Sequence, residues 1–409
     1  MIDPSNSAPA RPASRPMPPS SRPELRLPDA EGAAVRHELR TTPVRPPEPR
    51  AVFDREAYSA AHVVSAAWVE HDPWVETPID WERTLAFREY LWDLGLGVAE
   101  AMDTAQRGMG LGWPAARSLI EQTLALASRR RGARVVCGIG TDQLPPKPRH
   151  ALREIADAYL EQCDFVESRG GQVVMMASRA LAASAGGADD YAWVYEQVLM
   201  HARRPVVLHW LGSMFDPHLA GYWGARDFES NLETVLGVMR AHAAKVDGIK
   251  LSLLDMDKEI MLRRRLPAGV KMFTGDDFNY AELIEGDEYG HSHALLGIFD
   301  AIAPAASAAL AALAQGRTEQ FRDILAPTVP LSRHLFKAPT QFYKTGVVFL
   351  AWLNGQQPHF QMLGGMQSAR SLPHLVELFR LADRAGVLRD PELACARMRG
   401  LLRINGFDA

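Results

Sequence analysis

From about residue 60 onward, short apolar segments of the chain alternate with longer segments of helical periodicity. The short segments are typical of strands and lie at residues 62–68, 97–102, 134–139, 171–177, 205–210, 247–252, 269–274 and 293–299. Most of them are continuous apolar runs without alternation, which indicates parallel strands that are buried on both faces. The pattern therefore predicts an α/β protein built on a parallel sheet.

Helical patterns fill the intervals between these segments. Asp80 is suited to cap a helix that begins at Trp81, and Pro114 suits the first turn of the next helix. Further helical patterns cover residues 148–166, 191–202 and 231–243. Such strand-and-helix units can close into a (β/α)8 TIM barrel, which leaves no edge strand. A doubly wound open sheet is the alternative, although the segment WVEHDPW after the first predicted strand has no glycine-rich phosphate turn.

The two ends of the chain differ from this central pattern. Residues 1–50 hold twelve of the 28 prolines and little apolar surface to offset the loss of chain entropy on folding. We therefore expect a disordered Pro-rich tail over residues 1–50 and the barrel over residues 51–303. Residues 304–409 carry helical patterns such as LPHLVELFRLADRAG, which predict a C-terminal helical extension.

Composition excludes several classes of partner. A formal net charge of −4 with 23% charged residues offers no basic surface for nucleic acid or an anionic membrane. No apolar run reaches the roughly 18 residues of a membrane helix, and the first residues lack the apolar centre of a secretory signal. The 3 cysteines form no disulfide or metal motif. We expect a cytoplasmic protein with no nucleic-acid or membrane partner.

The strongest chemical candidates stand at the ends of the fifth and sixth predicted strands, where barrel enzymes carry their active sites. Lys250 lies in the apolar segment GIKLS, and burial would lower its pKa so that a neutral amine could form a Schiff base. The alternative is a structural lysine paired with a carboxylate such as Asp276. His209, in LHWLG, would carry protons if it faces inward and would be a core histidine if it does not.

Polar residues follow two other predicted strands. Gly275, Asp276 and Asp277 follow the seventh, and their acids could hold a polyol, a metal or the lysine, or could cap the next helix. Asp103 and Thr104 open a polar cluster after the second strand. All five are candidate substrate-binding residues.

A metal site is a weaker candidate. His291 and His293 would point the same way on a strand. They precede the eighth predicted strand, however, and therefore lie on the face that serves stability rather than catalysis. We expect no metal and no cofactor.

The order and spacing of these motifs resemble the dihydrodipicolinate synthase and N-acetylneuraminate lyase superfamily over residues 60–395. GIKLS resembles that family's sixth-strand signature, whose lysine forms a Schiff base, and the matching residue is Lys250. FTGDD resembles the seventh-strand signature S-G-D-D and matches it at Gly275, Asp276 and Asp277. The resemblance implies a (β/α)8 barrel with a helical extension and a homo-oligomer, dimer or tetramer.

The chain departs from the family at two motifs. His209 stands where the family has a proton-relaying tyrosine, and only Thr104 is comparable with the turn that holds the carboxylate of pyruvate. The arginine that some members use for a second carboxylate is absent from SMFDP. The chain therefore resembles a divergent branch in which lysine chemistry is retained and pyruvate is in doubt.

We hypothesise a class I, Schiff-base-forming lyase, aldolase or dehydratase that acts on a small carbonyl compound such as a keto sugar or a 2-oxo acid. Lys250 would attack the carbonyl group and His209 would move the proton. One alternative is a metal-dependent barrel lyase, isomerase or hydrolase that uses His209, His291 and His293. The other is a barrel that binds a metabolite without catalysis. Trapping with borohydride separates the first hypothesis from the other two.

Overall fold

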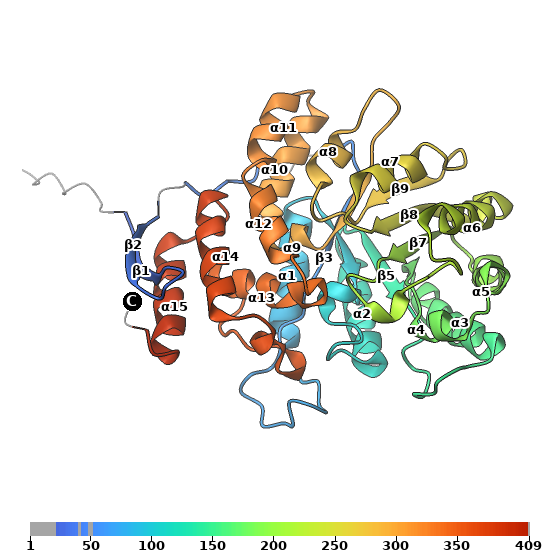
Figure 1. Ribbon diagram of the computed structural model, residues 1–409, viewed down its shortest axis with the longest axis horizontal. Helices are drawn as coiled ribbons and strands as arrows, with labels where there is room; N and C mark the ends of the chain where they lie inside the picture. Colours follow the sequence, from blue (N-terminus) through green and yellow to red (C-terminus); the bar gives the residue numbers. More distant parts are fainter. Residues whose placement is uncertain (1–21, 40–41, 48–51, 408–409) are drawn as a thin grey trace, which may run out of the picture.

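The computed structural model describes residues 22–39, 42–47 and 52–407. Its centre is a closed barrel of parallel strands in the order β10-β3-β4-β5-β6-β7-β8-β9 (Figure 1). The strands are β3 (Ala57–Ala60), β4 (Gly97–Glu100), β5 (Val135–Ile139), β6 (Gln172–Met175), β7 (Val206–Leu211), β8 (Val246–Ser252), β9 (Lys271–Thr274) and β10 (His293–Leu296). Because β10 pairs with β3, the sheet closes on itself. The prediction of a (β/α)8 TIM barrel is confirmed.

The first barrel strand lies earlier in the chain than predicted. β3 ends at Ala60, whereas the prediction placed a strand at 62–68. That segment pairs with no strand of the barrel. His62 N donates to Asp300 at 2.8 Å and Val64 N donates to Thr84 at 3.0 Å, and a single antiparallel bridge joins Ser65 to Ile79. An apolar run is buried in either setting, so its composition alone could not locate the strand.

Helices surround the barrel much as the sequence predicts. The outer ring contains α1 (Trp81–Asp93), α2 (Trp113–Ala127), α3 (Leu152–Ser168), α4 (Arg179–Ser184), α5 (Ala188–His201), α6 (Phe228–Ala241), α7 (Met256–Arg263) and α8 (Tyr280–Glu285). Asp80 caps α1 by accepting from Arg83 N at 3.1 Å. Inside the barrel, alternate strand residues such as Tyr58, Val207 and Phe273 form a small apolar core.

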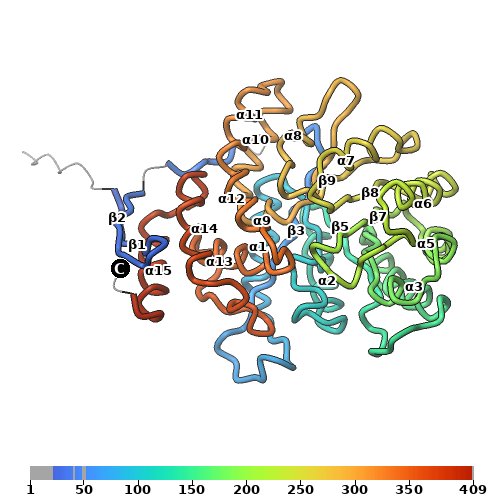
Figure 2. Tube along the Cα trace, in the orientation of Figure 1, coloured from blue at the N-terminus to red at the C-terminus, as the bar shows by residue number. Residues whose placement is uncertain are grey.

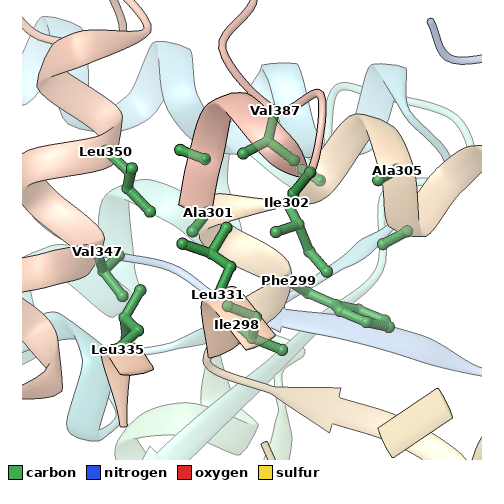
Figure 3. Packing of buried hydrophobic residues seen from close by; sticks show 14 of the residues in the cluster. Ile298, Phe299, Ala301, Ile302, Ala305, Leu331, Leu335, Val347, Leu350 and Val387 are labelled. Atoms are coloured by element: carbon green, nitrogen blue, oxygen red, sulfur yellow. The ribbon is translucent and has the colours of Figure 1, made fainter. Parts of the chain in front are cut away.

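The C-terminal helices gather on one side of the barrel (Figure 2). They are α9 (Ile298–Ala301), α10 (Ala303–Ala314), α11 (Thr318–Leu325), α12 (Thr328–Leu335), α13 (Tyr343–Leu353), α14 (Leu372–Arg384) and α15 (Pro391–Ile404). Figure 3 shows Ile298, Leu335 and Val347 from three of these helices in one apolar cluster. The predicted helical extension is present, and its boundary at residue 303 stays a proposal. None of the helices in the described ranges is long and apolar enough to cross a bilayer.

Part of the predicted disordered tail is a folded hairpin. β1 (Glu24–Pro28) pairs antiparallel with β2 (Ala34–Glu38), and Figure 1 shows the pair beside α15. Leu25 and Leu27 are buried, and Arg380 of α14 donates to the Pro28 carbonyl at 2.8 Å. The prediction of disorder is therefore wrong for this segment, because the hairpin buries its apolar face against helices distant in sequence. Residues 1–21, 40–41 and 48–50 of the predicted tail lie outside the described residues.

Candidate active site

A cleft of about 540 Å³ opens at the carboxyl ends of the barrel strands. It is lined by the segments that follow β4, β5 and β6 and by the end of β7. A second, smaller cavity of about 10 Å³ adjoins it around Lys250, and we call this cavity the lysine pocket. Its lining residues are Ala60, Met102, Asp103, Thr104, His209, Leu211, Phe215, Lys250, Ser252, Asp277, Gly297 and Tyr343. Because Asp103 and His209 line both cavities, the lysine pocket is the inner end of the cleft.

Lys250 projects into the barrel from β8. Its strand neighbours Ile249 and Leu251 belong to the apolar cluster outside the barrel, so alternation along the strand turns the lysine inward. The side chain is buried, and its ammonium nitrogen makes no hydrogen bond or ion pair with any described residue. Burial lowers the pKa of Lys250 to about 8, while the Asp277 and Asp103 carboxylates oppose this shift. Roughly a tenth of the lysine is therefore neutral at pH 7, far more than for a lysine with an ordinary pKa.

His209 lies directly beside Lys250 in the paired strands β7 and β8. Its Nε2 is 3.1 Å from Ser252 Oγ, and its buried Nδ1 has no partner in the part of the chain that the structure describes. Burial, followed by the positive charge of Lys250, holds the pKa of His209 well below the ordinary 6.5. The imidazole is therefore neutral at rest.

The two aspartates after β9 have different surroundings. Asp277 lines the lysine pocket and accepts from Ile298 N at 2.8 Å, and burial raises its pKa to about 7 against the attraction of Lys250. Asp276 accepts from Phe278 N at 2.8 Å and from Asn279 N at 3.1 Å, and it lines neither the cleft nor the lysine pocket. The alternative ion pair between Lys250 and Asp276 is not formed, and of these two aspartates Asp277 is the one that faces the lysine.

Gly275 acts through packing. A Cβ atom at this position would collide with Ser252 Oγ and would lie 2.8 Å from Lys250 Cε. The glycine therefore lets the end of β9 pack against the stem of the lysine.

The segment after β4 meets the C-terminal extension at the lysine pocket. Thr104 Oγ1 is 2.7 Å from Tyr343 Oη, and Lys344 Nζ pairs with Asp103 Oδ1 at 2.9 Å. Sequence reasoning missed Tyr343 and Lys344 as site residues. The sequence did carry one signal, since a tyrosine and a lysine begin the largely apolar segment YKTGVVFLAWL. Polar side chains at the start of a helix that is almost entirely buried need polar partners.

The turn that carries Asp103 and Thr104 is fixed by its own backbone conformation and by a contact with the C-terminal extension. Ala101 and Gln106 have positive φ angles of 52° and 65°, which non-glycine residues rarely adopt. Gln106 Nε2 donates to the Leu363 carbonyl at 2.9 Å, which fixes the turn against the C-terminal extension. The strained turn therefore presents both side chains to the lysine pocket in a fixed geometry.

The histidines proposed for a metal site do not form one cluster, because the adjacent rings of His291 and His293, whose centroids are 5.4 Å apart, lie away from His209. His291 and His293 lie at the amino end of β10, opposite the end that holds His209, and His293 Nδ1 accepts from Glu56 N at 3.0 Å. Within the described ranges, no cluster of three or more His, Cys, Asp or Glu side chains could hold a metal ion.

The fold places the chain among barrels of the dihydrodipicolinate synthase type. The dihydrodipicolinate synthase structures from Aquifex aeolicus (13% identity, TM-score 0.61), Thermotoga maritima (15%, 0.60) and Oceanobacillus iheyensis (16%, 0.60) are similar to it. The matches cover 82%, 82% and 80% of this chain and 99%, 100% and 95% of those chains, respectively. At such low identity the likeness shows a shared fold.

A family model described as "Protein of unknown function (DUF993)" matches residues 25–407, and the chain belongs to this family. Comparison with curated proteins gives no significant match. The resemblance suggested by the residues is confirmed at the level of the fold, which this chain shares with structures of dihydrodipicolinate synthases.

Proposed function

We propose that this protein is a class I lyase, aldolase or dehydratase that forms a Schiff base between Lys250 and a small carbonyl compound such as a keto sugar or a 2-oxo acid. The observation that carries the proposal is a buried lysine, with no ion pair among the described residues, at the inner end of a cleft. A desolvated neutral amine at the carboxyl end of a barrel strand is suited to attack a carbonyl carbon.

In the proposed reaction, Lys250 Nζ attacks the carbonyl carbon and the oxygen is protonated to give a carbinolamine. Asp277, whose raised pKa of about 7 lets it carry a proton, protonates the leaving hydroxyl as water departs and the imine forms. In an aldol cleavage, the neutral His209 takes the proton of the β-hydroxyl group while the C–C bond breaks and its electron pair moves into the protonated imine, which gives a carbonyl product and an enamine. In a dehydration, His209 takes the proton of the α-carbon to give the enamine, which then expels the β-hydroxyl group. The imidazolium returns its proton, to the α-carbon after cleavage or to the departing hydroxyl as water in dehydration, and water then hydrolyses the imine to free Lys250.

The other predicted substrate-binding residues divide into two groups in this proposal. Asp103 and Thr104 contact the substrate, since they line the lysine pocket. Gly275 and Asp276 support the site from behind, because the first packs on Lys250 and the second caps the turn that carries Asp277.

Borohydride reduction in the presence of candidate carbonyl compounds tests the proposal. A reduced adduct, detected by mass spectrometry, is expected on the peptide that contains Lys250. Lys250→Ala and Lys250→Arg should each abolish both turnover and adduct, because neither side chain offers a neutral amine. Lys258→Ala, which removes a lysine whose side chain is 41% exposed, is the matched control and should keep both. Full activity in either Lys250 variant would end the Schiff-base proposal.

We further propose a homo-oligomer, dimer or tetramer, in the cytoplasm. The segment between β3 and α1 exposes Trp68 (92%) and Trp74 (86%) and extends away from the barrel (Figure 1). Large exposed apolar side chains in one place are typical of an interface. Light scattering should report a multiple of 45.2 kDa, and the double variant Trp68→Ser/Trp74→Ser should shift it toward the monomer. A wild-type monomer would contradict the proposal. The three free cysteines are all buried, which suits a reducing compartment.

A further inference from the structure

Asp103 uses only one of its two carboxylate oxygens. Oδ1 pairs with Lys344, but the buried Oδ2 has no hydrogen-bond partner in the described part of the chain. The Thr104 and Tyr343 hydroxyl groups bond to each other at 2.7 Å, and the Tyr343 hydroxyl also interacts with the Asp103 carboxylate, without a well-formed hydrogen bond to Oδ2. A buried carboxylate oxygen without a donor is unfavourable, so a donor from a bound molecule would be stabilising. Because Asp103 lines both the cleft and the lysine pocket, its carboxylate borders the space where a substrate would be held.

The charges around the lysine pocket disfavour a carboxylate beside the reacting carbonyl. Asp103 and Asp277 both act on Lys250, so the group next to the carbonyl lies between two acids. A substrate carboxylate at that position would be repelled by Asp103, and by Asp277 whenever that acid is ionised.

The cationic groups nearby are already engaged. Arg107 bonds to Asp142 at 2.9 and 2.6 Å and to the Ala101 and Gly138 carbonyls at 3.2 and 2.9 Å. Lys344 pairs with Asp103 itself and does not line the lysine pocket. No described guanidinium is therefore free to receive a carboxylate at this pocket.

We propose that the substrate carries a hydroxyl group on the carbon next to its reacting carbonyl, and that Asp103 Oδ2 accepts a hydrogen bond from this hydroxyl. The substrate class is then an α-hydroxy ketone or keto sugar rather than a 2-oxo acid. This inference rests on the proposed Schiff-base function and decides between the two substrate classes that the function leaves open.

Hydroxyacetone and pyruvate form a matched pair of probes, since they differ only in a hydroxymethyl group against a carboxylate. The rate of borohydride-trapped adduct formation at Lys250 should be at least about tenfold higher with hydroxyacetone. Pyruvate that traps as fast or faster would overturn the inference and leave the proposed function standing. If no carbonyl compound traps at Lys250, the proposed function itself fails.

Asp103→Asn tests the residue directly. The amide keeps an oxygen for Lys344 but replaces the free carboxylate oxygen with a donor, so hydroxyacetone should trap more slowly and pyruvate faster. The pH midpoint of trapping should also move down, because Asp103 favours the charged form of Lys250. Asp157→Asn, which alters an exposed acid of α3 outside both cavities, should leave the preference for hydroxyacetone over pyruvate unchanged. A folded Asp103→Asn variant with unchanged preference and midpoint contradicts the inference, and the wild-type comparison decides the matter if the variant does not fold.

Discussion

Lys250 should react as a neutral amine at a much lower pH than an ordinary lysine. A shift of its pKa from 10.5 to about 8 increases the neutral fraction at pH 7 roughly 300-fold. The shift can be measured by reductive methylation with formaldehyde over a series of pH values, with the modification of each lysine followed by mass spectrometry. Lys250 should show a midpoint near 8, and the exposed lysines of the same sample serve as the internal reference.

Two neighbouring substitutions identify the cause of the shift. Asp277→Asn should lower the midpoint further, because the Asp277 carboxylate stabilises the ammonium and its removal leaves burial unopposed. Asp276→Asn is the matched control and should leave the midpoint in place, since this side chain is engaged by Phe278 and Asn279 outside the lysine pocket. A wild-type midpoint near 10.5, or a rise in the Asp277→Asn variant, would refute the reasoning.

Three further outcomes are expected. Lys250→Met should raise the free energy of unfolding at pH 7 by up to roughly 3 kcal/mol, since a folded-state pKa of about 8 lies below the unfolded value. The wild type recovers this stability as the pH rises from 8 toward 10.5. Denaturant unfolding should therefore show a smaller difference in the free energy of unfolding between variant and wild type at pH 10 than at pH 7. An equal difference at both pH values contradicts the argument. His209→Phe should slow turnover about 10²- to 10⁴-fold while the trapped adduct at Lys250 persists, and equal loss of both would remove His209 from proton transfer. Activity should survive a chelator, whereas loss that a divalent ion restores would favour the metal-dependent alternative.

The local sequence pattern was sufficient to locate the site residues that lie on strands. Lys250 and His209 could be placed at one cavity because side chains alternate along a strand and adjacent parallel strands end together. The same reasoning could not separate Asp276 from Asp277, since both follow the end of β9 at Thr274, where the strand period no longer applies. Which acid faces Lys250 depends on the turn that precedes α8.

Long-range packing accounts for most of what the sequence left undetermined. Tyr343 meets Thr104 across 239 residues, and no local pattern relates the two. The hairpin at residues 24–38 posed the same difficulty, because its apolar residues find their partners on α14 and α15. The first strand was misplaced because an apolar run packs equally well in a sheet and beneath a helix.

The contact between the start of α13 and the turn after β4 has a consequence for biosynthesis. All eight strands of the barrel have been translated once Leu296 has left the ribosome, yet Tyr343 and Lys344 are still to come. Until they arrive, Thr104 and Asp103 lack their partners and the wall of the lysine pocket is open. A nascent barrel therefore carries Lys250 without its finished surroundings, and the lysine pocket is complete only when the last quarter of the polypeptide docks.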